Sequence, residues 1–171
     1  RNKTPRVSAR EYTTNITEAA SADQALNILK RMRRNNIQPD EYHYNAAMKV
    51  CAKGKQYTEA IKRFDEMQQH GIRPSVASYR IVLGACGKRG QLTHALHLFD
   101  ELKKSGTPLD VITYNATITA CRNCGQWHEA LALFHETMKQ GLHPNQVTYS
   151  ATSLLVVMLA SGKRPCCFGR R

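Results

Sequence analysis

The sequence has no apolar segment long enough to cross a lipid bilayer, and it is poor in acidic residues. Its longest apolar run is the seven-residue stretch LLVVMLA, from Leu154 to Ala160, whereas a transmembrane helix needs about 20 such residues. Only 13 acidic residues stand against 25 Lys and Arg, which gives a formal net charge of +12. We therefore expect a soluble protein with no membrane span. The charge suits a polyanionic partner such as nucleic acid or an anionic membrane surface, and it does not by itself choose between the two.

Motifs of catalysis and of metal binding are also missing. There is no HExxH segment, no nucleophile paired with a base, no pair of acid/base carboxylates and no glycine-rich phosphate loop. We therefore predict no enzymatic activity, no cofactor and no small-molecule substrate. Cys121 and Cys124 form a single CxxC, but no second CxxC accompanies it. We accordingly expect no metal site, although Cys166 and Cys167 could complete a set of four thiolates.

What the sequence does contain is a repeat of 35 residues. The segments EYHYNAAMKVC, VASYRIVLGAC, VITYNATITAC and QVTYSATSLLV begin at residues 41, 76, 111 and 146. A fixed period of this length is the signature of a repeat architecture. The recurring columns are Tyr44, Tyr79, Tyr114 and Tyr149; Ala25, Ala60, Ala95 and Ala130; Phe64, Phe99 and Phe134; Gly71, Gly106 and Gly141; and Cys51, Cys86 and Cys121. The cysteine column indicates a repeated structural position in a reducing compartment rather than a disulfide framework.

Each repeat has the pattern of two amphipathic helices. Within residues 57–70, apolar residues fall at positions i, i+1, i+4 and i+7 counted from Ala60, and Gly71 follows as a candidate C-terminal cap. Residues 41–53 also place small or apolar residues three and four apart, after the N-cap candidate Asp40. Two such helices cannot bury their faces alone. We therefore predict an all-α fold, a solenoid of stacked helical hairpins.

The repeat boundaries follow from the columns. In the repeat that begins the array only the second helix is clear, and Ser21 and Gln24 stand at capping-box spacing before it. Residues 111–114 are β-formers, but we expect them in the first turn of a helix because packing overrides local propensity. The predicted segments are a basic stub (1–5), a degenerate repeat (6–40), three full repeats (41–75, 76–110 and 111–145), a partial repeat (146–161) and a basic tail (162–171).

These columns resemble the pentatricopeptide repeat family over roughly residues 21–156. The matching residues are TYN at 113–115, Glu-Ala at 59–60 and 129–130, Leu-Phe at 98–99 and 133–134, and the closing segments GIRPS, GTPLD and GLHPN. The resemblance implies a right-handed superhelix whose inner groove holds single-stranded RNA, with about one base read by each repeat. It also implies a mitochondrial or plastid factor in RNA processing, stability or translation, with other RNA-processing proteins as further candidate partners.

Two alternatives stay open at this point. One is a peptide-binding or scaffolding protein of the tetratricopeptide type, although the 35-residue period and the missing Trp/Leu-Gly/Tyr pattern fit that repeat less well. The other is the repeat segment of a larger RNA-processing protein.

The resemblance also implies roles for individual residues. In the family, the residue after the Tyr and the last residue of the repeat choose the base, and the residue two before the Tyr packs against it. The implied base-reading residues are Asn45 with Ser75, Arg80 with Asp110, Asn115 with Asn145, and Ser150 without a partner. The implied base-packing residues are Tyr42, Ala77, Ile112 and Val147, and those that touch phosphate are Lys53 and Lys88, from whose column Asn123 departs.

The chemistry of these residues suits base recognition. Asn carries donors and an acceptor, so at a groove-facing helix start it can bond a Watson-Crick edge. By resemblance, Asn paired with Ser or Asn implies that repeats 41–75 and 111–145 prefer pyrimidines. Arg80 would contact phosphate, stack on a base or pair with Asp110, so we assign no base to its repeat. The closing residues of the repeats are, in addition, good helix N-caps.

Overall fold

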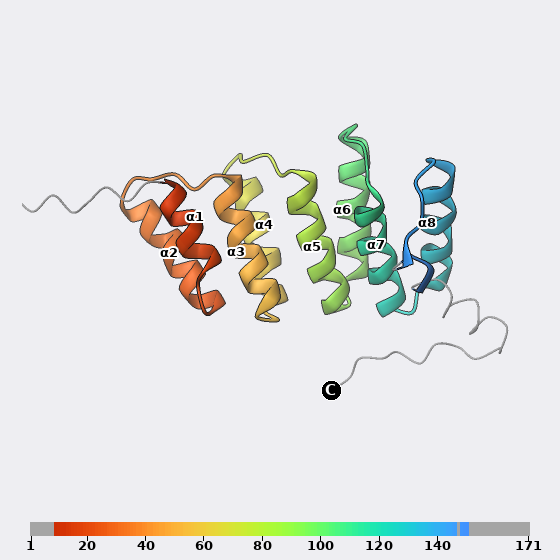
Figure 1. Cartoon of the computed structure of the whole chain (residues 1–171), viewed down its shortest axis with the longest axis horizontal. Coiled ribbons are helices and arrows are strands. Elements are labelled where there is room, and N and C mark those ends of the chain that lie inside the picture. Colours follow the sequence, from red (N-terminus) through yellow and green to blue (C-terminus); the bar gives the residue numbers. More distant parts are fainter. Residues whose placement is uncertain (1–8, 147, 151–171) are drawn as a thin grey trace, which may run out of the picture. The chain divides into compact units, whose positions relative to one another are not determined.

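The computed structural model describes residues 9–146 and 148–150, and these residues form α-helices and no strand (Figure 1). The all-α prediction is therefore confirmed. The stub at 1–5, most of the partial repeat and the tail at 162–171 lie outside the described residues. The helices are α1 (Ala9–Thr17), α2 (Ala22–Arg34), α3 (Glu41–Lys53), α4 (Tyr57–Gln69), α5 (Val76–Arg89), α6 (Leu92–Lys104), α7 (Val111–Asn123) and α8 (Trp127–Lys139).

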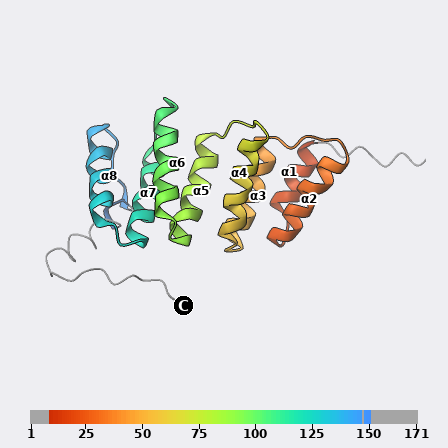
Figure 2. The ribbon, with the colours of Figure 1, turned by 180° about the vertical axis from the view of Figure 1, so that it is seen from behind.

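The chain forms two compact bodies, residues 1–81 and residues 82–171, with the boundary inside α5. In the first body, α1 packs against α2 and α3, and α3 packs against α2 and α4. In the second body, α7 packs against α6 and α8. The helices of each pair lie side by side in both views (Figures 1 and 2). Each body is thus built from helical hairpins, as the repeat pattern predicts.

Aromatic contacts join consecutive repeats inside each body. The ring of Phe64, on α4, meets the ring of Tyr79 edge-on, with centroids 5.1 Å apart and planes inclined by 66°. Phe99 and Tyr114 repeat this contact at 5.2 Å and 68°. Edge-to-face geometry is favourable for aromatic pairs, beyond the area that they bury. The Phe and Tyr columns are therefore the seam between one hairpin and the next.

The cysteine column is also part of the core. Cys51, Cys86 and Cys121 form no disulfide bond and are fully buried. Burial raises the pKa of Cys51 to about 11 and that of Cys121 to about 12. Because the thiolate is the reactive form, these protonated thiols are inert packing groups. The predicted structural role of the column is confirmed.

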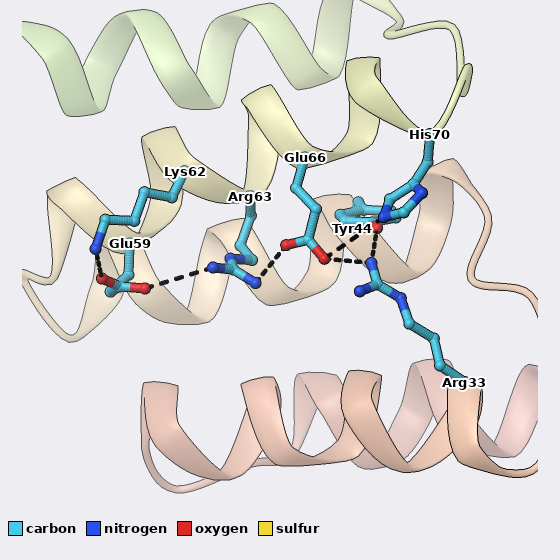
Figure 3. Close-up of polar contacts among 7 residues, drawn as sticks. All are labelled: Arg33, Tyr44, Glu59, Lys62, Arg63, Glu66 and His70. Atoms are coloured by element: carbon cyan, nitrogen blue, oxygen red, sulfur yellow. Dashed lines mark hydrogen bonds and ion pairs between the residues drawn. The ribbon is translucent and has the colours of Figure 1, made fainter.

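A polar cluster surrounds the hydroxyl of each of two column tyrosines. Arg33, on α2, donates hydrogen bonds to the Tyr44 hydroxyl and to the Glu66 carboxylate (Figure 3). Burial, and then the charge of Glu66, raise the pKa of Tyr44. Lys103 and Glu136 stand two repeats after Arg33 and Glu66, and they form an ion pair. Burial, and then the charge of Glu136, likewise raise the pKa of Tyr114.

Ion pairs extend the first of these clusters along α4. Glu66 also accepts a hydrogen bond from Arg63, whose guanidinium lies 3.7 Å from the Glu59 carboxylate (Figure 3). Glu59 in turn pairs with Lys62 at 2.7 Å, and its pKa is lowered, mainly by that hydrogen bond. These charges lie on α2 and α4, so they link the second helices of two consecutive repeats.

The degenerate first half of repeat 6–40 contains a helix, α1, that the sequence did not make clear. Ala9 stands where the other repeats have the column Tyr. Instead, Tyr12 and Ile16 are fully buried one turn apart and cluster with Leu29 and Met32. Ile16 occupies the column position of Cys51, so an apolar core residue is retained where the repeat pattern is lost.

Left-handed residues end the second helices, as the Gly column predicts. Gly71, Gly106 and Gly141 have φ values of 71°, 70° and 70°. The first repeat has Asn36 at this position, with φ of 56°. Asn enters the left-handed region more readily than most residues with a side chain, because its amide can bond locally.

A second left-handed column ends the first helices, and one of its members is a lysine. Gly90 and Gly125 have φ values of 74° and 73°, whereas Lys55 has φ of 60° at the equivalent position. A Cβ in this region costs about 1–2 kcal/mol. Replacing Lys55 with Gly would remove this cost. Part of the gain in stability would be lost, because Gly loses more backbone entropy on folding than Lys does.

We predict that Lys55→Gly raises the free energy of unfolding by about 0.5–1 kcal/mol. The matched control is Asn36→Gly, for which we expect a smaller gain since Asn tolerates this conformation. Urea unfolding followed by circular dichroism measures both values. A loss of stability in Lys55→Gly, or a larger gain in Asn36→Gly, would contradict the prediction.

Candidate nucleic-acid interface

The closing residues of the repeats begin the first helices. The Asp40 and Asp110 carboxylates accept hydrogen bonds from the backbone N–H groups of His43 and Thr113, at 3.1 and 2.9 Å. Asn145 Oδ1 accepts one from Thr148 N at 3.1 Å. The predicted N-cap role of these three residues is confirmed. Ser75 instead makes the reciprocal hydrogen bond of a capping box, in which its backbone N–H donates to the side chain of the third helix residue, Ser78 Oγ, at 3.3 Å.

In repeat 111–145 the two implied base-reading residues are in direct contact. Asn115 is only 7% exposed, and its Nδ2 donates to Asn145 Oδ1 at 3.0 Å. Its Oδ1 accepts a hydrogen bond from Thr148 Oγ1 at 2.6 Å. Sequence reasoning missed Thr148, although it stands in the column of Thr113 and Ser78, the third residue of each first helix. A base that engages Asn115 must therefore use the second donor or lone pair of this amide, or replace one of these two hydrogen bonds.

In repeat 41–75 the corresponding pair is connected through two other residues. Asn45 is 9% exposed, and its Nδ2 donates to Glu41 Oε1 at 3.0 Å. The same carboxylate oxygen lies 3.5 Å from Ser78 Oγ, which lies 3.4 Å from Ser75 Oγ. Asn45 Oδ1 is buried without a hydrogen-bond partner among the described residues. Sequence reasoning missed Glu41, even though it precedes Asn45 by one helical turn.

Two residues of the implied base-packing column are large, apolar and exposed. Tyr42 is 73% exposed and Ile112 is 55% exposed. Each precedes the Asn that is implied to read a base by three residues, so the two side chains are neighbours on the helix surface. Ala77 is half-buried, and Val147 lies outside the described residues. An exposed flat or branched side chain beside a polar one is what a stacked base requires.

A hollow of about 250 Å³ lies between α5 and α7 in the second body. It brings together three residues to which the resemblance gives different roles: Ile112 for packing, Asn115 for reading and Lys88 for phosphate. Its other lining residues are Gly84, Gly87, Ala116, Thr119 and Asn123.

Glycines on α5 shape this hollow. A Cβ on Gly87 would lie 2.9 Å from both Cα and Cβ of Ala120, whereas a Cβ on Gly84 would meet no atom within 4 Å. Gly87 thus lets α5 approach α7, and Gly84 leaves space beside the contact. Asn123 Nδ2 donates to the Gly87 carbonyl at 3.1 Å. This bond gives Asn123 a structural role in the column where Lys53 and Lys88 stand.

The remaining implied residues are more scattered. Lys53 is exposed at the end of α3, and Ser150 is exposed at the end of the described chain. Arg80 belongs to the first body and Asp110 to the second. Their pairing stays a prediction, as do the roles of the other implied residues.

In the described part of the chain, no group of three or more His, Cys, Asp or Glu side chains is placed to hold a metal ion. No described helix has both the length and the apolar character that a membrane span requires. Cys166 and Cys167 lie outside the described residues.

Comparison with known families identifies the repeat. A family model described as "Pentatricopeptide repeat-containing protein" matches residues 14–137. This match covers most of the chain, and the helical hairpins agree with it. The chain therefore belongs to the pentatricopeptide repeat family. A search of curated proteins gives no match.

Solved structures of the same family are similar in fold. The pentatricopeptide repeat protein PPR10 in complex with an 18-nt psaJ RNA element has a TM-score of 0.76 and 26% sequence identity, over 94% of this chain and 25% of that chain. The PPR domain of Arabidopsis thaliana protein-only RNase P 1 in complex with tRNA has a TM-score of 0.75 and 17% identity, over 90% of this chain and 80% of that one. The chain spans about a quarter of the length of PPR10.

We predict opposite effects on stability for alanine at the two glycines of α5. Gly87→Ala places a methyl group against Ala120 and should lower the free energy of unfolding by about 1–3 kcal/mol. Gly84→Ala meets open space, and the better helix propensity of Ala should raise it by about 0.5–1 kcal/mol.

Thermal and urea unfolding of the two variants, compared with the unchanged chain, measure these effects. A Gly87→Ala variant as stable as Gly84→Ala would show that α5 and α7 do not approach each other as closely as the structure has them.

Proposed function

We propose that this chain binds single-stranded RNA and reads about one base with each full repeat. The observation that carries the proposal is the hollow between α5 and α7. It is large enough for a small planar group, and it presents an exposed apolar side chain, an amide and a lysine together. A nucleotide needs those three kinds of contact: stacking for the base, hydrogen bonds for its edge and a cation for its phosphate.

The net charge supports the same ligand. A formal +12 on 171 residues draws a polyanion to the surface whatever its sequence. Selectivity must then come from the amides. We propose that Asn45 with Ser75 and Asn115 with Asn145 read pyrimidines, that Tyr42 and Ile112 pack on bases, and that Lys88 and Lys53 contact phosphates.

The similar structures favour RNA over a peptide ligand. The structure of PPR10 is a complex with an RNA element, and that of the repeat domain of protein-only RNase P 1 is a complex with tRNA. Since the second of these is the domain of an RNA-processing protein, we also propose that these repeats can act as one part of a longer protein. A mitochondrial or plastid location is proposed from the family alone.

Binding energetics agree with a role as part of a larger reader. Stacking on a protein side chain contributes about 1–3 kcal/mol per base, and the cost of ordering an RNA strand must be subtracted from the sum. Three bases also specify only about one site in 64, since each repeat reads one of four bases. Useful selectivity therefore calls for further repeats or a partner protein.

We predict that the chain binds short pyrimidine RNAs more tightly than purine RNAs and that binding weakens as salt rises. Fluorescence anisotropy with labelled 12-nt RNAs at 50 and 200 mM salt measures both effects, because counterion release makes affinity fall by a power of the salt concentration. Absence of binding even at the lower salt would contradict the proposed function.

Two variants test the residue assignment separately. Asn115→Ala should reduce pyrimidine affinity by about 5- to 30-fold, which corresponds to about 1–2 kcal/mol. The matched control is Asn27→Ala, which removes an exposed Asn from α2, a second helix. Thermal unfolding of both variants verifies the fold. If Asn115→Ala is folded and its base preference is unchanged, the assignment of Asn115 as a base-reading residue is contradicted, whereas the proposal that the chain binds RNA still stands.

A further inference from the structure

The Glu41 carboxylate lies between the two residues that are implied to read the base in repeat 41–75. Its Oε1 accepts a hydrogen bond from Asn45 Nδ2 at 3.0 Å and lies 3.5 Å from Ser78 Oγ. Ser78 Oγ is in turn 3.4 Å from Ser75 Oγ. A base edge that approaches Asn45 and Ser75 must therefore also meet a negative charge.

Glu41 also fixes the orientation of the Asn45 amide. The Asn45 side chain is more than nine-tenths buried, and its Oδ1 has no hydrogen-bond partner among the described residues. Burying an acceptor without a donor is costly, and rotation of the amide could relieve it. Such a rotation would turn Oδ1 toward the carboxylate, where two acceptors repel each other. The amide nitrogen is thus held on the Glu41 side.

The other two full repeats have no such group. Val76 and Val111 occupy the position of Glu41 in repeats 76–110 and 111–145. In the last of these repeats the amide of Asn115 is held instead by Asn145 and Thr148. The carboxylate, together with the closing residue (Ser75 in place of Asn145), therefore distinguishes repeat 41–75 from repeat 111–145, although Asn45 and Asn115 are the same residue type at the same position.

The next residue along the chain supplies the surface for a base. Tyr42 is strongly exposed, and it shares the first turn of α3 with Glu41 and Asn45. A base that stacks on the Tyr42 ring has its polar edge within reach of that turn. Glu41 is itself only half-buried, so a ligand can reach its carboxylate.

We propose that Glu41 is a specificity-determining residue that makes repeat 41–75 favour cytosine over uracil. A carboxylate only accepts hydrogen bonds, and cytosine offers the N4 amino group as a donor. Uracil has the O4 carbonyl in that place, and this oxygen is repelled by the negative charge. The proposal rests on the proposed RNA binding, and it goes beyond a general pyrimidine preference.

The test compares affinities of the full chain for 12-nt oligocytidine and oligouridine at pH 7.5, so that every register presents the same base. Glu41→Val gives repeat 41–75 the residue that its two neighbours have. We expect the preference for oligocytidine to fall about fivefold or more, mainly because oligouridine binds better. Glu41→Gln, which keeps the length of the side chain and can turn its amide toward either base, should shift the ratio in the same direction.

The reciprocal variant Val111→Glu should raise the preference for oligocytidine. An unchanged ratio in Glu41→Val and Glu41→Gln, with both RNAs still bound, overturns the inference alone. If Glu41→Val binds both RNAs more tightly by the same factor, the inference is overturned as well. Such a result would mean that Glu41 only repels phosphate in general and does not distinguish the bases. If the unchanged chain binds neither RNA, the proposed function fails and the inference fails with it.

Discussion

The buried column tyrosine of the first helices α3, α5 and α7 is the contact on which the packing of consecutive hairpins inside each body depends. The ring of Tyr79 or Tyr114 meets the Phe of the preceding hairpin edge-on. The hydroxyl of Tyr44 lies beside Arg33 of the preceding second helix, and Glu66 of its own second helix completes the cluster. Tyr114 combines both contacts, because its ring meets Phe99 of the preceding hairpin and its hydroxyl interacts with Lys103 and Glu136. Tyr suits the position because it combines a large buried ring with a group that requires a partner.

This constraint also positions the candidate base-reading residues. Asn45 and Asn115 follow Tyr44 and Tyr114 directly, on short helices whose first turns are capped by Asp40 and Asp110. A side chain next to a fixed ring and inside a capped turn has little freedom to move. Recognition sites that rest on rigid elements hold their geometry more closely than sites on loops. The core and the proposed interface are therefore adjacent positions of the same helix turn.

The period of the sequence was sufficient to predict α2 to α8, because the Tyr, Ala, Phe and Gly columns each have one structural meaning, whereas α1 lacks the column Tyr and was not clear from the sequence. Even the residues at 111–114, which have high β-propensity, form the first turn of α7, as the repeat period predicts. The contacts of Glu41, Thr148 and Gly87 could not be predicted in the same way. They depend on which side chains meet across a helix turn or between repeats, and Glu41 and Gly87 occur in one repeat only. A period reveals what repeats share, whereas base selection depends on what distinguishes them.

The candidate base-reading amides already form hydrogen bonds within the protein. The Asn115 amide is bonded to Asn145 and Thr148, and the Asn45 amide to Glu41. Wherever a base takes over one of these hydrogen bonds, it only exchanges one partner for another, and such an exchange gains little free energy for the correct base. The discrimination comes from the incorrect base, because it leaves a buried amide or carboxylate without a partner. A pre-formed polar network in a repeat of this kind therefore favours selectivity, while stacking and charge provide the affinity.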